Sequence, residues 1–403
     1  MVETNFKHTE IGLIPHDWEV KTLGELFIFN AGGDVQKDCY STVKIGDKTN
    51  PIYSNSLENK GLYGYTSNPR YTANAITITG RGSLGHAEYR NHAFDAIVRL
   101  LVLSPIRDTI DCSFVTNEIN FLVPFVFEST GVPQLTVPQA QSAIIPLPPT
   151  LAEQERIAGA LSSIDTLIGA LNEQIEKKRH IKQGTMQQLL TGKKRLAGFT
   201  GEWIEKSIDE LGDLTGAGVD KTSKEDEIPV RLVNYLDVFH RDTIYNRELN
   251  FWVTANETKL QQCNVKCGDV FFTPSSEMPY DIALSAVAME DMRNVCYSYH
   301  IYRLRFKENI DLNYRAYMFK AASFYEQANT TCEGSGKRYV ISLTKFKKLS
   351  VYYPVDIAEQ RAIAAVLSGM DTEIAALEQK RDKYIAIKSG MMQDLLTGKI
   401  RLV

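Results

Sequence analysis

Three short stretches of this sequence carry residue types that could do chemistry. The Asn-Pro-Arg-Tyr sequence at 68–71 is close to the Asn-Pro-Pro-Tyr with which amino-methyltransferases hold a target amino group. The Phe-Asn-Ala-Gly-Gly sequence at 29–33 misses the glycine spacing of their cofactor loop by one position. Arginine replaces the second proline of the first motif, and the segment at 64–67 before it does not read as a buried strand. We therefore predict no methyltransferase site here.

The third stretch, Asp17-x-Glu19-x-Lys21, weakly matches an acidic nuclease triad, but Trp18 inside it recurs in the second half of the chain and indicates a structural strand. No Gly-x-x-x-x-Gly-Lys-Ser/Thr sequence occurs, so a P-loop motor is not expected. Cys263 and Cys267 lack a second pair at metal-ligand spacing. We predict that the cysteines are reduced and that Cys263 and Cys267 are small buried residues on strands.

The composition is that of a globular protein, and 403 residues suffice for two to three domains. A net charge of −4 argues against nucleic-acid binding through bulk positive charge, although a local basic face remains possible. No apolar run is long enough for a membrane span, and the N-terminus lacks the apolar core of a signal peptide. We expect a cytoplasmic protein of bacterial or archaeal type with no membrane contact.

A long internal repeat sets the organisation of the chain. Residues 152–196 align with 358–402 at a constant offset of 206, and 25 of the 45 pairs are identical. Both copies end in Leu-Leu-Thr-Gly-Lys-x-Arg-Leu, at 189–196 and 395–402, which we call the end motif. A repeat of this length fixes the architecture before any single motif does.

Each copy reads as one long helix with apolar residues alternately three and four positions apart, which is typical of a coiled-coil seam. We expect the two helices to pack antiparallel and to offer this seam for subunit docking. The seam residues are Ile157, Leu161, Ile164, Ile168, Leu171, Ile363, Leu367, Met370, Ile374 and Leu377.

Capping signals bound both helices. Thr150 with Glu153 predicts a reciprocal capping box, and Asp356 with Glu359 predicts an equivalent cap. The end-motif glycines at 192 and 398 are expected just past the helix ends, followed by cations. Glycines 184 and 390 inside the helices leave two alternatives open, a bend or the close approach of a partner backbone.

A weaker repeat around Trp18 and Trp203, at offset 185, precedes each long helix. The predicted plan is a variable domain at 1–149, a helical spacer at 150–196, a second variable domain at 197–355 and a second spacer at 356–403. The fold class is α+β: two strand-rich globular domains separated by two long helices that form an antiparallel, coiled-coil-like spacer with pseudo-two-fold symmetry.

The variable domains read as short strands joined by glycine-rich or polar loops. A strand at 75–79 precedes a loop at 80–85, a strand at 267–272 precedes a loop at 273–276, and 333–339 reads as a basic loop. Loop Tyr, Arg, Asn and Ser suit contacts to bases and phosphates, and they also suit ordinary loop surfaces. The candidate DNA-contact residues are Tyr53, Asn55, Arg81, Ser83, Arg231, Asn234, Ser275, Tyr280, Lys337, Arg338 and Tyr339.

With Leu-Pro-Pro-x-x-Ala-Glu-Gln at 147–154 opening the first helix and the end motif closing both, the whole chain resembles the specificity subunit of type I restriction-modification systems. The resemblance implies two target recognition domains, each reading one half of a bipartite, asymmetric sequence in double-stranded DNA. The helices would set the unread spacer between the halves and dock two methyltransferase subunits.

The resemblance further implies that the chain has no catalytic residues and no bound cofactor or metal of its own. S-adenosylmethionine would belong to the methyltransferase subunits, and ATP and Mg²⁺ to motor-endonuclease subunits that join the complex. The family has no fixed base-contacting motif, so the candidate contact residues come from the loops alone. Two other classes stay open: a protein-binding scaffold, and an enzyme with an unfamiliar site.

Overall fold

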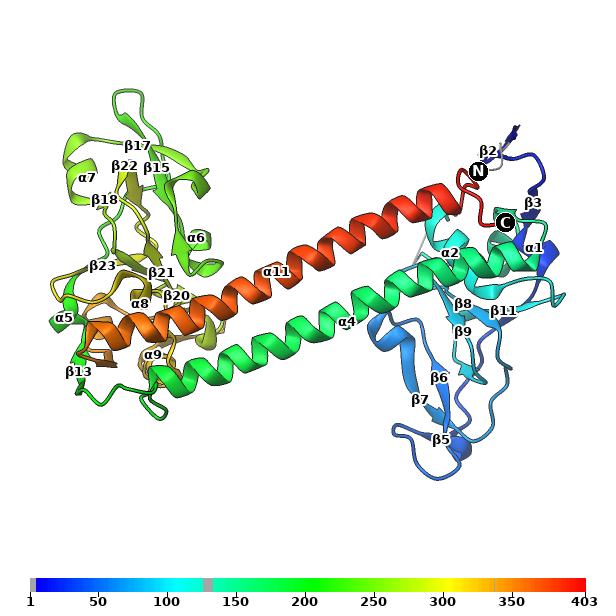
Figure 1. Ribbon diagram of the computed structural model, residues 1–403, viewed down its shortest axis with the longest axis horizontal. Helices are drawn as coiled ribbons and strands as arrows, with labels where there is room; N and C mark the ends of the chain where they lie inside the picture. The colour runs from blue at the N-terminus through cyan, green and yellow to red at the C-terminus, as the bar shows by residue number, and fades with distance from the viewer. Residues whose placement is uncertain (1–4, 126–132, 337) are drawn as a thin grey trace. The chain divides into compact units, whose positions relative to one another are not determined.

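The computed structural model describes residues 5–125, 133–336 and 338–403 (Figure 1). Their contacts divide the chain into two compact units. Unit 1 combines Met1–Asn172 with Gln379–Val403, and unit 2 is Glu173–Glu378. Two long helices, α4 (Leu151–Leu190) and α11 (Ile357–Leu395), contribute a part to each unit. Each unit is therefore built from both halves of the sequence repeat.

The core of unit 1 is an antiparallel sheet in the order β4-β11-β8-β9, covered by helix α2. Buried aliphatic side chains of β8 and β11, such as Ile76, Ile78 and Leu103, meet Phe114 of α2. The elements are β4 (Phe27–Ala31), β8 (Ala75–Thr79), β9 (Ala87–Arg90), β11 (Leu100–Pro105) and α2 (Cys112–Leu122).

A second sheet of unit 1, in the order β10-β6-β7-β5, forms a lobe that projects away from α4 (Figure 1). Its strands are β5 (Tyr40–Ser41), β6 (Asn50–Tyr53), β7 (Leu62–Thr66) and β10 (Asp95–Ala96). The strand β7 corrects our expectation for 64–67, because Gly64 and Thr66 are buried in a strand. The remaining elements of unit 1 are β1 (Phe6–Thr9), β2 (Gly12–Pro15), β3 (Glu19–Thr22), α1 (Leu23–Leu26), α3 (Val137–Gln141) and β12 (Ile144–Leu147).

Unit 2 contains a five-stranded sheet, β14-β23-β19-β21-β16, and a four-stranded sheet, β17-β15-β22-β18. Phe271 and Phe272, adjacent in β19, point to opposite faces and enter two separate cores. The strands are β14 (Gly212–Thr215), β15 (Ile228–Val233), β16 (Thr243–Ile244), β17 (Trp252–Ala255), β18 (Asn264–Val265), β19 (Val270–Phe272), β21 (Ser285–Ala288), β22 (Met292–Tyr297) and β23 (Tyr302–Phe306).

Short helices and ribbons complete unit 2. They are β13 (Trp203–Ser207), α5 (Ile208–Leu211), α6 (Tyr235–Phe239), α7 (Glu257–Gln262), β20 (Ser275–Ser276), α8 (Leu312–Arg315), η5 (Met318–Lys320), α9 (Ala322–Thr331), β24 (Glu333–Ser335), β25 (Arg338–Val340), α10 (Leu343–Phe346) and β26 (Ser350–Pro354). Two loop predictions were wrong here. β24 pairs antiparallel with β25, and β20 at 275–276 pairs with β25 from its other side. In addition, 267–269 form a turn before β19 and not its first residues.

Within each unit, α4 and α11 run antiparallel. In unit 1, Lys388 pairs with Asp165 at 2.6 Å, and Arg156 donates to the carbonyl oxygen of Leu402 at 3.0 Å. In unit 2, Lys178 pairs with Glu373 at 2.6 Å, and Lys182 pairs with Asp371. The pairs Asp165–Lys388 and Lys182–Asp371 occupy equivalent positions of the repeat, which confirms the predicted antiparallel helix pairing and α+β fold class.

The predicted seam is buried unevenly. Ile157 and Leu161 belong to the core of unit 1, and Ile363 and Leu367 belong to the core of unit 2. These four residues therefore pack each helix against a globular core, a contact that the seam prediction did not include. The others are buried at Ile164, Leu171 and Ile374 and half-buried at Ile168, Met370 and Leu377.

Both helices run without interruption through their internal glycines. A Cβ atom placed on Gly184 or Gly390 would meet no other atom of the chain within 4 Å. Neither glycine therefore serves a close approach within the described part of this chain.

The cysteine prediction was correct only in part. Cys263 is buried, but it lies beside a helix and not on a strand. Cys267 is exposed in the turn before β19. In the described residues, no three His, Cys, Asp or Glu side chains gather as metal ligands would.

Candidate nucleic-acid interface

The end motif of one repeat copy binds the start of the other copy's helix. In unit 1, Arg401 forms a bidentate ion pair with Glu153 at 2.5 and 2.8 Å, and it also binds Asp17 at 2.8 Å. In unit 2, Arg195 pairs with Glu359, with 2.6 Å between Nη2 and Oε2. Arg195 and Arg401 are equivalent in the repeat, as are Glu153 and Glu359. We call these two contacts the crossed ion pairs.

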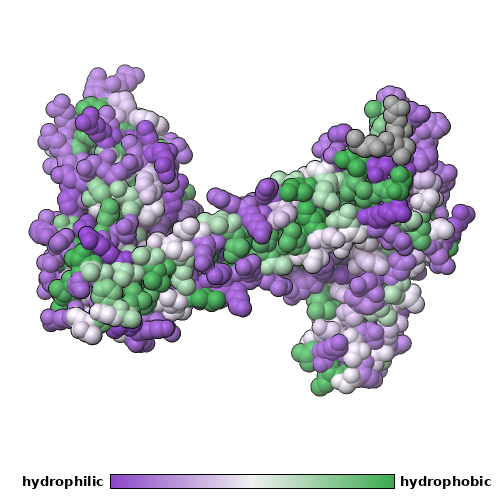
Figure 2. Space-filling model, viewed as in Figure 1, coloured by the Kyte–Doolittle hydropathy of each residue, from purple (hydrophilic) through white to green (hydrophobic). Residues whose placement is uncertain are grey.

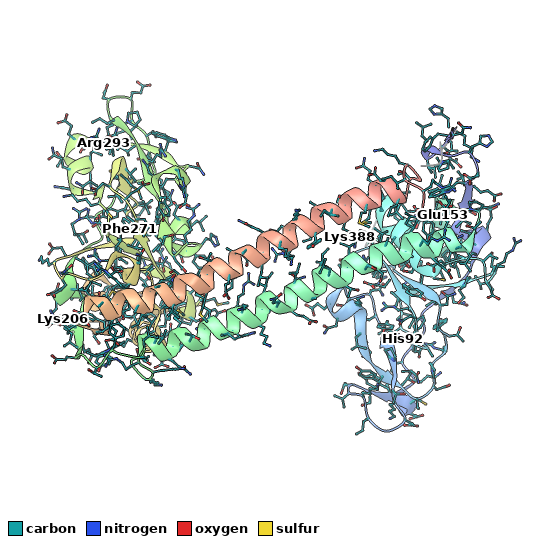
Figure 3. The ribbon with its side chains drawn as sticks, viewed as in Figure 1. His92, Glu153, Lys206, Phe271, Arg293 and Lys388 are labelled. Carbon is teal, nitrogen blue, oxygen red and sulfur yellow. The ribbon has the colours of Figure 1, made fainter. Side chains whose placement is uncertain are left out.

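The crossed ion pairs correct our capping prediction. Thr150 Oγ1 does accept from the Glu153 amide at 3.3 Å, and Asp356 accepts from the Ala358 amide at 2.8 Å. The Glu153 and Glu359 carboxylates do not return to their own helix starts, because they bind arginines instead. The hydrogen bonds that Arg401 donates to Glu153 raise the pKa of Arg401, and Arg401 lowers the pKa of Asp17. Figure 3 shows Glu153 at the start of α4.

The repeated tryptophans form the floor of the crossed ion pairs. The Arg401 guanidinium lies 5.6 Å from the ring centre of Trp18, and Arg195 lies 5.5 Å from that of Trp203. Gly192 and Gly398 both have φ of +67° and pack on these rings. A Cβ on Gly398 would approach Pro15 to 2.3 Å, so this position requires glycine.

The glutamine of Ala-Glu-Gln has a matching role in both units. Gln154 donates to the carbonyl oxygen of Pro148 and accepts from the Asp111 amide at 2.9 Å. Gln360 donates to Pro354 and accepts from the Asp311 amide at 2.8 Å. Each long helix is thereby tied to the strand that precedes it and to a helix of the globular core.

The candidate contact residues of unit 1 cluster around one loop. Asn55 Oδ1 accepts from the Gly80 amide at 2.7 Å, which links β6 to the 80–85 loop that carries exposed Arg81 and Ser83. Tyr53 is buried, with its hydroxyl 2.8 Å from His92 Nε2. Arg81 and Ser83 therefore present their side chains outward, while Tyr53 and Asn55 support the surface from below.

The candidates of unit 2 fall into two groups. Pairing of β20 with β25 places Ser275 opposite Val340 and Ser276 opposite Tyr339, and Arg338 precedes Tyr339 in β25. Lys337 lies outside the described residues. Tyr280 is 62% exposed, and Asn234, which caps α6, is buried. Arg231 lies on β15 and donates to the carbonyl oxygen of Asn246 at 2.6 Å.

Unit 2 also has an exposed aromatic and basic surface that we did not predict from the sequence. Trp252 is 57% exposed and lies 5.3 Å from the Arg231 guanidinium, and Arg247 lies 4.9 Å from the Tyr245 ring. Phe251 is 43% exposed. Such surfaces can stack on bases and bind phosphates. Two adjacent aromatic residues, Phe251 and Trp252, at the start of the edge strand β17 could have indicated this surface.

Side chains of the methyltransferase-like motif make structural contacts. Arg70 pairs with buried Asp95 at 2.5 Å and donates to the Ala96 carbonyl oxygen at 2.8 Å. Tyr71 stacks on Phe94 with ring centres 5.3 Å apart. Arg70 of the motif thereby holds β10 in the lobe sheet.

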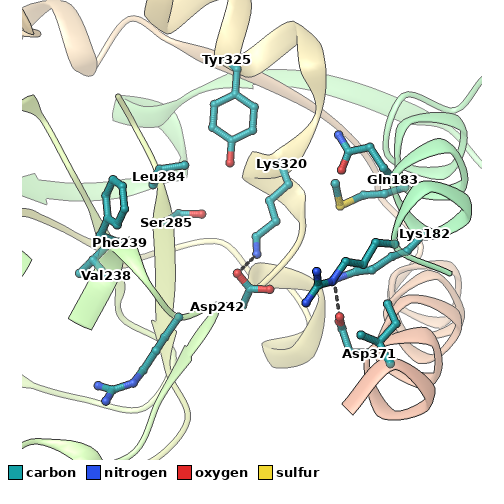
Figure 4. Close-up of a pocket in the computed structure, with 14 residues that line it drawn as sticks. Lys182, Gln183, Val238, Phe239, Asp242, Leu284, Ser285, Lys320, Tyr325 and Asp371 are labelled. Atoms are coloured by element: carbon teal, nitrogen blue, oxygen red, sulfur yellow. Dashed lines mark hydrogen bonds and ion pairs between the residues drawn. The ribbon is translucent and has the colours of Figure 1, made fainter. Parts of the chain in front are cut away.

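A hollow of about 400 Å³ in unit 2 lies between α4, α11 and η5 (Figure 4). Its floor is Lys320, which is 9% exposed and paired with Asp242, and burial lowers the pKa of Lys320. Lys182 pairs with Asp371 at the helix side, and Asp371 accepts from the Tyr317 hydroxyl at 2.9 Å. Lys182 and Lys320 are each paired with a carboxylate, so we read these ion pairs as contacts that hold the helices to the core.

Comparison with known proteins decides the family. The model of the type I restriction modification DNA specificity domain matches twice, at residues 15–178 and 200–386. The chain belongs to this family. It is a specificity-subunit chain with two DNA specificity domains, and each match runs from a repeated tryptophan into a long helix.

Relatives of similar length support this family. The type I restriction enzyme MjaVIII specificity subunit of Methanocaldococcus jannaschii is 24% identical, covering 99% of this chain and 97% of its own. The putative MjaX specificity subunit of the same archaeon is 26% identical over the same shares. None of the helices in the described ranges is long and apolar enough to cross a membrane.

Solved structures share the specificity-subunit fold. The S subunit of a type I system from M. genitalium has a TM-score of 0.58 at 15% identity, covering 98% of this chain and 97% of that one. A chain from a study of complex assembly and conformational transition in a type I system has a TM-score of 0.56, covering 96% and 99%.

Proposed function

We propose that this chain is the non-catalytic DNA-reading subunit of a type I restriction-modification complex in the cytoplasm. Each specificity domain reads one half of a bipartite, asymmetric target in double-stranded DNA. The observation that carries this proposal is the duplication itself: two dissimilar strand-rich regions, each joined to the same helix, tryptophan and crossed ion pair. A repeated frame with divergent inserts fits a protein that reads two different sequences with one geometry.

The two long helices serve, in this proposal, as a spacer and as the docking surface for two methyltransferase subunits. The repeat offers equivalent exposed apolar side chains at Ile181 and Ile387, which are 45% and 40% exposed. Apolar surface is visible along these helices in Figure 2. S-adenosylmethionine would be bound by the methyltransferase subunits, and ATP and Mg²⁺ by motor-endonuclease subunits. This chain would bind none of them.

A domain exchange tests the two-reader proposal. Replacing residues 18–149 with the matching segment of another family member is expected to change one half of the methylated sequence and to leave the other half intact. Methylome sequencing of a host carrying the hybrid with its methyltransferase reads this out directly. The matched control exchanges residues 203–354 and should change only the opposite half. A hybrid that changes both halves at once would contradict independent readers.

A paired insertion tests the spacer proposal. The division between the units falls at Asn172 in α4 and at Glu378 in α11, which are equivalent residues of the repeat. Four residues inserted after each would lengthen both helices by roughly 6 Å at about 1.5 Å per residue. With about 3.4 Å per base pair, we expect the unread spacer to grow by roughly two base pairs.

The control for this insertion replaces Glu173 and Gln379 with alanine at the same boundary without a change of length. Methylome sequencing should return the parent spacer for the control and a longer spacer, with both half-sites unchanged, for the insertion. An active insertion variant that keeps the parent spacer would show that the helices do not set it.

A further inference from the structure

The lobe of unit 1 contains a hollow of about 440 Å³ whose lining is basic. Lys44, Lys60 and His92 line it together with polar and aromatic side chains, and none of the lining residues is acidic. The hollow opens between β6, β7 and the turn that carries His92, which Figure 3 labels on the lobe. A basic hollow without carboxylates stands out in a chain with a net charge of −4.

Beneath this hollow lies a buried positive charge. Arg90 is 3% exposed, and its guanidinium carbon lies 3.5 Å from the ring centre of Tyr53, which lines the hollow. Its nitrogens donate to the Thr77 hydroxyl at 3.0 Å and to the Lys60 carbonyl oxygen at 2.9 Å. Among the described residues, no carboxylate lies within ion-pair distance of Arg90. The charge of Glu88, which pairs with Lys60 at 3.7 Å and with His86 at 3.2 Å, acts on Arg90 from farther away.

A buried cation without a counter-ion is costly, and an anion bound close to it offsets that cost. The field of Arg90 is felt at the hollow, since burial and then the charge of Arg90 lower the pKa of His92. The His92 ring lies between Asn91 Oδ1, 2.7 Å from its Nδ1, and the Tyr53 hydroxyl, 2.8 Å from its Nε2. The hollow therefore offers positive charge from its lysines and from Arg90 to a bound anion.

The backbone at the rim is held in an unusual conformation. Asn59 and Lys60 have φ of +48° and +54°, a left-handed region that costs non-glycine residues energy. The hydrogen bond from Arg90 to the Lys60 carbonyl oxygen holds this turn. The Lys60 side chain is 76% exposed, lines the hollow and lies 3.7 Å from the Glu88 carboxylate. Exposed Val43 and Ile45 flank Lys44 on the same lobe.

We propose that this hollow binds a backbone phosphate of the target DNA, with Lys44 and Lys60 as its direct ligands and Arg90 as the buried charge beneath. This rests on the proposed function and adds a positioning contact to the first specificity domain. A phosphate contact fixes the position of a reader on the duplex without reading a base. The role of Tyr53 is then to support Arg90 and not to touch DNA.

The test is a salt series of duplex binding by the complex of this chain with its methyltransferase subunits. Lys60→Gln is expected to weaken binding several-fold for every duplex sequence, and to lower the slope of log affinity against log salt by about one. Lys37→Gln is the matched control, because Lys37 is exposed on the same lobe but does not line the hollow. It should leave the slope unchanged.

Three results would overturn the phosphate site. The first is an unchanged slope for Lys60→Gln, and the second is an equal effect of Lys37→Gln, which would indicate diffuse charge. The third is a loss confined to duplexes with one particular base pair, which would indicate base reading. Inorganic phosphate alone provides a further arm: if it shifts the His92 NMR signals while Lys60→Gln leaves duplex binding intact, the hollow is a free-anion site.

Failure of the proposed function gives a different result. If the parent complex binds no duplex in a sequence-selective way, the DNA-reading function falls and the phosphate site falls with it. If the parent complex binds a bipartite duplex and Lys60→Gln matches the parent, only the phosphate site is overturned. Thermal unfolding of each variant checks that the lobe is intact.

Discussion

Arg401→Met is expected to destabilise unit 1 by about 3–5 kcal/mol. The reason is that Glu153 is 1% exposed, and Arg401 is its bidentate partner. Removing the guanidinium leaves a buried carboxylate with no cation, which costs far more than losing an exposed ion pair. The equivalent change Arg195→Met is expected to destabilise unit 2 by stranding Glu359 in the same way.

Thermal unfolding together with hydrogen exchange checks this result. Arg401→Met should speed exchange in peptides covering 144–161, while peptides inside unit 2 stay protected. The matched control is Arg293→Met, since Arg293 is exposed on β22 and forms no ion pair with a described residue (Figure 3). The double variant Arg401→Met with Glu153→Leu should recover most of the loss, because it removes both charges. A single variant as stable as the parent would exclude the crossed ion pair as a stabilising contact.

Glu118→Met is expected to stabilise unit 1 by about 1–3 kcal/mol near pH 8. Glu118 on α2 is 0% exposed, and neither carboxyl oxygen has a hydrogen-bond partner among the described residues. Counting from Asp111 and Asp311, which bind equivalent glutamines, the matching position in unit 2 is the buried Met318. Methionine therefore suits this environment, whereas a carboxyl group does not.

The effect of Glu118 should depend on pH with a definite sign. Burial raises the pKa of Glu118 well above its ordinary value of 4.5. Above pH 4.5 the unfolded chain loses this proton while the folded protein keeps it, so the parent loses stability as pH rises. Unfolding midpoints from pH 4.5 to pH 8 should show the advantage of Glu118→Met growing with pH. Glu118→Gln should remove the same pH dependence with a smaller gain, and an advantage that shrinks with rising pH would contradict a buried neutral carboxyl.

The repeat allowed the helical part of this fold to be predicted from sequence alone. A constant offset of 206, a regular apolar spacing and capping residues at both ends defined α4 and α11 to within a few residues. These signals are local, because a helix is closed by hydrogen bonds between residues four apart. The partners of Glu153 and Glu359 were missed for the opposite reason. Arg401 is 248 positions away from Glu153, and the local capping box competed with that distant partner.

The variable regions were predicted only in outline. The strand at Ala75–Thr79 was predictable from its β-branched residues. The pairing of β24 with β25 was not, because Gly334 and Gly336 are typical of loops and because the third strand, β20, is distant in sequence. The candidate DNA contacts stay a prediction. Residue type alone could not show that Arg81 is exposed whereas the side-chain oxygen of Asn55 accepts a hydrogen bond from the Gly80 amide. Arg90 carried no sequence signal, because its importance lies in its burial without an ion-pair partner among the described residues.

The division of the chain also bears on the order in which it folds during synthesis. Unit 2 is a continuous segment, Glu173–Glu378, and can close on itself as soon as that segment has been made. Unit 1 begins first but needs Gln379–Val403, which the ribosome adds only after all of unit 2. Until then Trp18, Leu161 and Glu153 lack the residues that cover them. The nascent first domain therefore keeps these side chains uncovered until the last residues of unit 1 have been made.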